Sequence, residues 1–163
     1  MHQAYFLKNR QSKLLSKIDV FLYGALTTEK LGSIVGDVTV ICGAILKNYS
    51  IKVCVSKVFN GSSVATVLPH DNTDVLGIMY TLNERQMDLL ELLQGQKTGL
   101  CKKKVVQVFD GQANRTVTMF VSCEGEGQAS GDQTRPNAAY QRLHQSLVRE
   151  AYALCRTQVD NHV

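Results

Sequence analysis

Short apolar or alternating stretches recur along the chain and are typical of β-strands. Residues 18–23 form an apolar, β-favouring run that stops at Gly24, which predicts a buried strand. The same pattern predicts strands over residues 38–46, 51–58, 63–68, 75–82, 100–109 and 116–121. Asn60-Gly61 and Asp110-Gly111 are turn sequences, so we expect two hairpins, and residues 69–72 predict a loop.

Two segments have helical periodicity instead. Residues 84–93 carry apolar side chains on one stripe, with Asn83 and Gln86 placed to form a capping box and Gly95 placed to end the helix. Residues 138–156 repeat apolar positions at helical spacing, which predicts an amphipathic C-terminal helix. Residues 27–30 predict only a helical turn, and residues 124–135 a surface loop.

This order of elements favours an α+β fold: a mostly antiparallel, barrel-like sheet with a middle helix and a C-terminal helix. The elements do not alternate as in a Rossmann fold. The glycine-rich nucleotide loops, the zinc-protease helix motif and the serine-hydrolase elbow are all absent from the sequence. The common motif-bearing enzyme classes are therefore not supported.

Length and cysteine usage limit the organisation of the chain. Its 163 residues suit one domain, which we place at residues 18–163, after a basic extension over residues 1–17. The five cysteines are odd in number and lack metal-ligand spacing, so we expect neither a disulfide framework nor a metal site. We therefore expect a reducing, cytoplasmic location. The basic, acid-free start is also typical of a mitochondrial presequence, which stays an alternative.

The net charge of +4 is modest, but basic residues cluster in two places. One cluster is the N-terminal extension, and the other is Lys102, Lys103 and Lys104. A nucleic-acid surface would explain both, yet no recognised binding motif accompanies them, so we expect a solvated strand face. The apolar runs are too short to span a membrane. We expect His70 and His144 to face solvent.

Three segments, in order, resemble the γ-glutamylcyclotransferase family. The first, Tyr23-Gly24-Ala25-Leu26, is similar to the Tyr-Gly-Ser-Asn-Leu loop with which that family cradles a glutamyl group. Ala25 stands where the family has two polar residues, so the loop is one residue shorter. The resemblance implies that these four residues contact substrate.

The second segment, Leu90-Glu91-Leu92-Leu93-Gln94-Gly95, looks like the family's Leu-Asp-x-x-Glu-Gly turn, with Gln94 at the position of the catalytic glutamate. The third, Pro136-Asn137-Ala138-Ala139-Tyr140, resembles the family's Pro-Ser-x-x-Tyr, which implies a substrate contact for Tyr140. The resemblance also implies an activity, the release of 5-oxoproline from γ-glutamyl compounds, that uses no metal or organic cofactor.

Gln94 changes what this site can do. Ring closure needs a group that accepts a proton from the substrate's α-amine and returns one to the departing amine. The amide of Gln94 has nearly the shape of a glutamate but cannot carry that proton. Glu91, three residues earlier, is a possible substitute, although it shares Gln94's side of the helix only in part.

Three hypotheses remain open from the sequence. The leading one is a catalytically silent or impaired member that binds a small γ-glutamyl ligand or a protein partner, with homodimer formation open. The second is an active cyclotransferase. The third is a nucleic-acid-associated component of a larger assembly, which the two basic clusters would serve.

Overall fold

The computed structural model describes residues 16–55, 63–96, 99–122 and 138–160. Five strands form a closed barrel in the order β1-β3-β2-β4-β5. The strands are β1 (Ile18–Leu22), β2 (Thr39–Val55), β3 (Ser63–Leu82), β4 (Cys101–Phe109) and β5 (Asn114–Ser122), and the helices are α2 (Thr28–Val35), α3 (Glu84–Gln94) and α4 (Ala138–Asp160). Neighbouring strands are antiparallel except β1 and β5, which run parallel. The predicted α+β barrel is confirmed.

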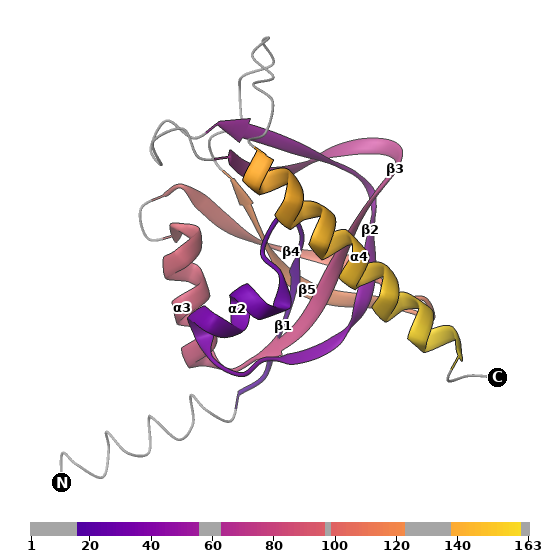
Figure 1. Ribbon diagram of the computed structural model, residues 1–163, viewed down its shortest axis with the longest axis horizontal. Coiled ribbons are helices and arrows are strands. Elements are labelled where there is room, and N and C mark those ends of the chain that lie inside the picture. The colour runs from indigo at the N-terminus through magenta and orange to yellow at the C-terminus, as the bar shows by residue number, and fades with distance from the viewer. Residues whose placement is uncertain (1–15, 56–62, 97–98, 123–137, 161–163) are drawn as a thin grey trace, which may run out of the picture.

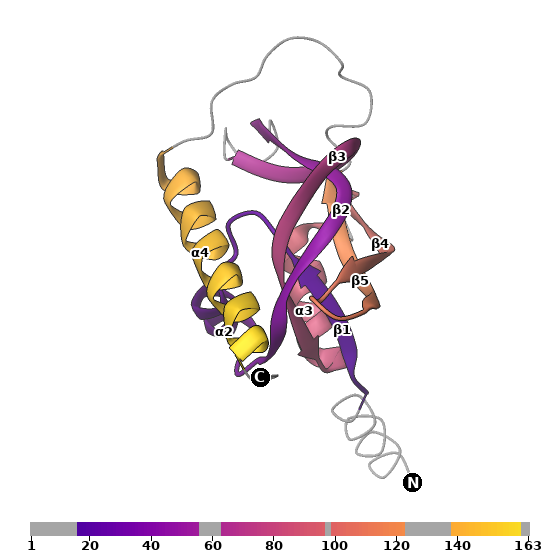
Figure 2. The ribbon, with the colours of Figure 1, turned by 90° about the vertical axis from the view of Figure 1, so that its right-hand side faces the viewer.

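The barrel has two apolar layers because successive strand residues point to opposite faces. Phe21, Met79 and Met119 belong to the cluster inside the barrel. Val20 and Leu22 belong to a second cluster, which the helices cover from outside. Figures 1 and 2 show α4 lying across β2 and β3. Helix α2 follows β1 in the chain and contacts α3, which follows β3.

Close packing of α4 depends on a glycine in β2. A β-carbon added at Gly43 would collide with the backbone of Ala151 and the sulfur of Cys155. Both residues belong to α4, so the missing side chain lets this helix approach the sheet. The approach fixes the position of the helix that also carries Tyr140 and His144.

The middle helix is confirmed in detail. Asn83 accepts a hydrogen bond from the backbone of Gln86, whose side chain in turn accepts from the backbone of Asn83. Gly95 closes α3 in the left-handed conformation, with φ of 76°. The predicted helical turn at residues 27–30 is longer than expected, because Thr27 caps a helix that continues to Val35.

Two predictions about the central hairpin were wrong in part. The strands expected at residues 38–46 and 51–58 form one strand, β2, and β3 continues through the loop expected at residues 69–72. The register explains both: Lys47 pairs with Asp74 and Tyr49 with Pro69, so residues 70–73 bulge opposite Asn48. Long-range pairing therefore overrides the local turn signals. The expected turn at Asn60-Gly61 lies outside the described residues.

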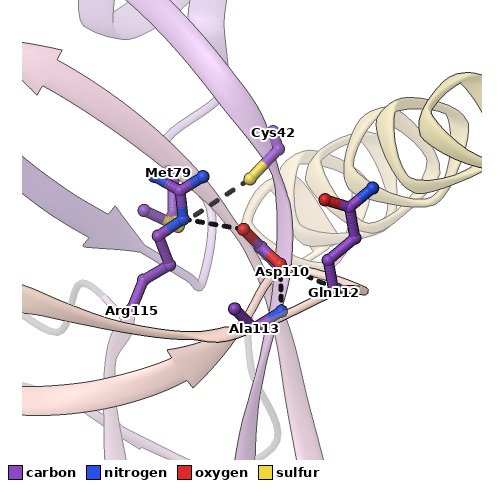
Figure 3. Close-up of polar contacts among 6 residues, drawn as sticks. All are labelled: Cys42, Met79, Asp110, Gln112, Ala113 and Arg115. Atoms are coloured by element: carbon purple, nitrogen blue, oxygen red, sulfur yellow. Dashed lines mark hydrogen bonds and ion pairs between the residues drawn. The ribbon is translucent and has the colours of Figure 1, made fainter. Parts of the chain in front are cut away.

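The second hairpin turns where the sequence predicts. The Asp110 carboxylate accepts hydrogen bonds from the backbone of Gln112 (2.8 Å) and Ala113 (2.9 Å) and from Nε of Arg115 (2.7 Å), as Figure 3 shows. These bonds, that from Ala113 above all, hold the pKa of Asp110 below its ordinary value. Gly111 takes the positive φ of 98° that the turn requires.

Candidate functional site

The loop of Tyr23, Gly24, Ala25 and Leu26, which we call the glycine loop, leaves the end of β1 and leads into α2. Gly24 has φ of +91°, a conformation that side chains rarely adopt. An added β-carbon would lie 3.2 Å from Cβ of Ala65 and 3.3 Å from the hydroxyl of Tyr140. Glycine is therefore required here by both conformation and space.

Helix α4 holds the loop from the other side. Nδ1 of His144 lies 2.7 Å from the carbonyl oxygen of Gly24. Its ring stacks on Tyr140, one helical turn earlier, with centroids 6.1 Å apart and planes at 11°. Tyr140 thus lies beside the loop, and the substrate contact that the resemblance implies for it stays a prediction. The expectation that His144 faces solvent was wrong, since the ring is half-buried against Gly24.

Tyr23 anchors the start of the loop. Its hydroxyl donates to the carbonyl oxygen of Phe120 at 2.6 Å. Burial raises the pKa of Tyr23 well above its ordinary value, and a hydrogen bond with the side chain of Thr66 opposes the rise in part. Thr66 is itself buried and accepts from the backbone of Ser122 at 3.1 Å. Tyr23 is thus a neutral, oriented hydroxyl.

The far end of the loop is fixed by a chain of three side chains. The hydroxyl of Thr28 donates to Glu150, so it must accept from the hydroxyl of Tyr80, 2.7 Å away. The other oxygen of Glu150 accepts from the backbone N–H of Thr28 at 3.5 Å. Burial raises the pKa of Tyr80 to about 12. No local motif could have indicated this contact, because the three residues come from different elements.

The remaining loop residues contribute backbone more than chemistry. Ala25 and Leu26 are half-buried, and Leu26 packs against the outer apolar cluster. Neither supplies a polar side chain, as expected from the shortened loop. Any hydrogen bonds to a ligand from this stretch would come from backbone N–H groups, which suit an oxyanion or a carboxylate.

Gln94 is the last residue of α3 and is half-buried. It follows Met87 by seven residues and Leu90 by four, both of them buried, so it faces the body of the protein. Helix α3 begins beside Ile18, because Leu82 pairs with that residue, and Figure 1 shows it running alongside β1. Its length of about 16 Å matches that of β1.

The contacts of α3 include α2, the helix that follows the glycine loop, and β3. The chain then returns to β4 at Cys101, which lies close enough to Tyr23 to influence its pKa. Residues 97–98 between them lie outside the described part. Among the contacts given for the described residues, none joins Gln94 directly to the loop.

Glu91 lies elsewhere. Its carboxylate is 2.5 Å from the ammonium of Lys103, and its side chain is 16% exposed. Both residues line a surface groove of about 410 Å³, which we call the α3–β4 groove. Its complete lining is Ile18, Glu84, Met87, Asp88, Glu91, Lys103, Val105 and Thr118. No contact given for the described residues joins Glu91 to the glycine loop, although Lys103 pairs in the sheet with Phe120, whose carbonyl oxygen accepts from Tyr23.

The described residues also bear on metal binding and on membrane spans. Within the described residues, no group of three or more His, Cys, Asp or Glu side chains is placed to hold a metal ion. The described helices also include none that is long and apolar enough to cross a membrane. The described side chains that hold the glycine loop and the start of α2 are hydroxyls, one imidazole and the carboxylate of Glu150.

Comparison by sequence with protein-family models and with curated proteins gave no match. Comparison with solved structures did. A γ-glutamyl cyclotransferase superposes with a TM-score of 0.71 over 89% of this chain and 86% of the other, at 18% identity. An uncharacterised protein from Homo sapiens gives 0.69 over 83% and 80%, also at 18% identity.

A γ-glutamyl cyclotransferase from yeast that is specific to glutathione gives a TM-score of 0.55 over 87% of this chain and 95% of the other, at 15% identity. These similarities agree with the fold that the sequence motifs predict. At such low identity they establish the γ-glutamylcyclotransferase-like fold and leave the chemistry to be argued from the residues present.

Proposed function

We propose that this chain, with its γ-glutamylcyclotransferase-like fold, binds a γ-glutamyl compound at the glycine loop and turns it over slowly or not at all. The proposal joins two features of the chain: a loop that is still held in shape for a ligand, and a glutamine where rapid proton transfer would need a carboxylate.

The observation that carries the proposal is the rigid support of the glycine loop. Tyr140 and His144 pack on Gly24, Tyr23 is tied to β5, and Glu150 holds the first turn of α2. These contacts fix the conformation of the loop, so a ligand that binds there would meet backbone already in place. Backbone N–H groups of such a loop would suit the carboxylate and carbonyl oxygens of a glutamyl group.

Gln94 supports the second part of the proposal. A general acid or base typically contributes about 10²- to 10⁴-fold to a rate, and an amide cannot serve as either. The amide can still donate to, and accept from, a bound ligand. Binding would therefore survive, while turnover would depend on proximity of the reacting groups and on whatever other base the site provides.

The active cyclotransferase is the alternative, and it needs such a base. Glu91 is poorly suited, because it pairs with Lys103 in the α3–β4 groove. The nucleic-acid alternative gains little from the structure. Lys103 pairs with Glu91 and Lys104 lies over the ring of Tyr49, so both lysines are engaged with side chains of this chain.

Calorimetry and product analysis together test the proposal. The full chain is titrated with L-γ-glutamyl-L-alanine, and the same mixture is assayed for 5-oxoproline. We expect measurable binding, with turnover at least about 100-fold slower than the median enzyme rate of about 10 s⁻¹. Ordinary enzymatic turnover would refute impaired catalysis, and absence of binding to any γ-glutamyl peptide would refute the ligand assignment. Retention on RNA that salt abolishes would favour the third hypothesis instead.

A further inference from the structure

Among the described side chains at the glycine loop, His144 is the one whose arrangement is suited to moving a proton. A carbonyl oxygen only accepts hydrogen bonds, so the contact between Nδ1 of His144 and Gly24 requires the proton to be on Nδ1. In the neutral ring the lone pair is then on Nε2. A proton can be added at Nε2 without breaking the bond that holds the ring.

The ring is also fixed in orientation. It stacks on Tyr140, whose hydroxyl in turn lies against Gly24, so imidazole, phenol and loop form one packed unit. Burial raises the pKa of Tyr140 to about 12, which keeps this neighbour neutral. The side chain is half-buried, so it combines a fixed position with partial exposure.

The other titratable groups around the loop are unsuited to this task. Tyr23, Tyr80 and Tyr140 all have a raised pKa and stay protonated near neutral pH. Glu150, on the same helix as His144, accepts from both the hydroxyl and the backbone of Thr28. Imidazole is the side chain that ordinarily changes protonation between pH 5 and 8.

We infer that His144 is the proton acceptor and donor of the glycine loop and carries the residual cyclotransferase turnover that Gln94 does not support. The inference rests on the proposed binding of a γ-glutamyl compound at that loop. It adds a catalytic residue at a position where the sequence motifs place none.

The proposed step balances in atoms and charge. Nε2 of His144 takes one proton from the ligand's α-ammonium, and the resulting amine attacks the γ-carbonyl carbon to form the ring C–N bond. The bond between that carbon and the departing amine then breaks, and the imidazolium returns its proton to the departing nitrogen. The ring nitrogen, which carries two hydrogens after the attack, gives its extra proton to the released amine. The products are 5-oxoproline and the released amine in its ammonium form, and the neutral imidazole is restored.

The test compares the full-length chain with His144→Asn, because the asparagine amide can still donate to Gly24 but cannot carry the proton. His70→Asn is the matched control, since His70 is an exposed histidine on β3. 5-Oxoproline release from L-γ-glutamyl-L-alanine is measured from pH 5.5 to 8.5, with calorimetry on the same samples. A His144→Ala variant is assayed with and without added imidazole.

We expect slow turnover that rises with pH, a loss of about 10²-fold or more together with the pH step in His144→Asn, and no change in His70→Asn. Partial recovery of His144→Ala with imidazole would support the same role should the asparagine variant fold poorly. An unchanged pH profile in His144→Asn would overturn the inference, as would turnover of the natural chain indistinguishable from the uncatalysed background. In the latter case calorimetry still decides separately whether the ligand is bound.

Discussion

The glycine loop and the α3–β4 groove differ in their chemistry. The glycine loop is held by two neutral hydroxyls and an imidazole, those of Tyr23, Tyr140 and His144. The α3–β4 groove is lined by three acidic residues, Glu84, Asp88 and Glu91, with one lysine, Lys103. The two regions share β1, because Ile18 lines the groove and Tyr23 follows the end of the strand.

This difference teaches that the support of a loop and the placement of carboxylates are separate features of this molecule. The glycine loop is held by neighbours from β5 and α4, whereas Glu91 of α3 pairs with Lys103 in the groove. Under the proposed function, the ligand would bind at the loop while the carboxylates of α3 occupy another surface. The predictions below substitute residues at the end of α3, at the glycine loop and in the α3–β4 groove, in that order.

The largest effect should come from restoring a carboxylate at the loop end of α3. We expect Gln94→Glu to raise the rate of 5-oxoproline release by about 10²- to 10⁴-fold, because a general acid or base would again be present. Release from L-γ-glutamyl-L-alanine is measured by liquid chromatography. The matched control is Gln96→Glu, which adds the same charge just beyond the helix.

An equal gain in both variants would point to a nonspecific charge effect. No gain in Gln94→Glu, with ligand binding intact, would mean that Gln94 does not face the ligand. The contrast between the glycine loop and the α3–β4 groove would then not explain a loss of catalysis.

The next effect concerns the shape of the glycine loop. We expect Gly24→Ala to lower the free energy of unfolding by roughly 2 kcal/mol, because alanine is strained at a φ of +91° and its methyl group would press on Ala65 and Tyr140. Ligand affinity should fall by more than about 10-fold with it. Urea denaturation and calorimetry measure the two quantities.

Gly32→Ala is the control for that substitution. Gly32 lies within α2, and an added β-carbon there meets nothing within 4 Å. Alanine should stabilise the helix by about 0.5 to 1 kcal/mol and leave binding unchanged. A similar loss of affinity in both variants would show that the loop itself is not the binding element.

Part of this arrangement could be predicted from sequence, and the reason is locality. The capping box of Asn83 and Gln86 and the turn at Asp110 use contacts within a few residues, so the sequence alone located α3 and the β4–β5 hairpin. The family motifs likewise marked Tyr23 to Leu26, Gln94 and Tyr140 as short stretches. Their positions along the elements are confirmed, and their roles stay predictions.

What the sequence did not predict depends on pairing over long separations. Strands β2 and β3 continue past Asn48 and Pro69, with a bulge in their pairing there. No local signal in the sequence indicates that bulge. His144 and Glu150 meet the glycine loop only because α4 packs across β2 and β3. A histidine on an amphipathic helix carries no mark of the carbonyl that it will contact.

Alkaline pH should lower the free energy of unfolding through the buried hydroxyl of Tyr140 beside the glycine loop. Burial raises the pKa of Tyr140 from 10.0 to about 12, so its hydroxyl stays protonated in the folded chain after it ionises in the unfolded one. The stability it contributes is complete below about pH 10 and is lost as pH rises toward 12. Tyr140→Phe should therefore reduce the fall in unfolding free energy over this range by about 1 to 2 kcal/mol.

Denaturation at pH 8, 10 and 11 measures this effect. Tyr152→Phe is the control, because Tyr152 lies on the same helix with 62% of its surface exposed. That variant should follow the natural chain at every pH. Should Tyr140→Phe do the same, the hydroxyl beside Gly24 is not protected from ionisation.

The smallest effect is expected in the α3–β4 groove. Glu91→Gln breaks the ion pair with Lys103, whose side chain is 41% exposed, so screening limits the cost to at most about 1 kcal/mol. Ligand affinity and the rate of 5-oxoproline release should stay as they are, because the carboxylate of Glu91 is engaged by Lys103 and no contact given for the described residues joins it to the glycine loop. Lys103→Met, and the double variant, separate the energy of the pair from the loss of either charge. A fall in rate of about 10²-fold in Glu91→Gln, but not in Lys103→Met, would instead identify Glu91 as the base and erase the distinction between the two regions.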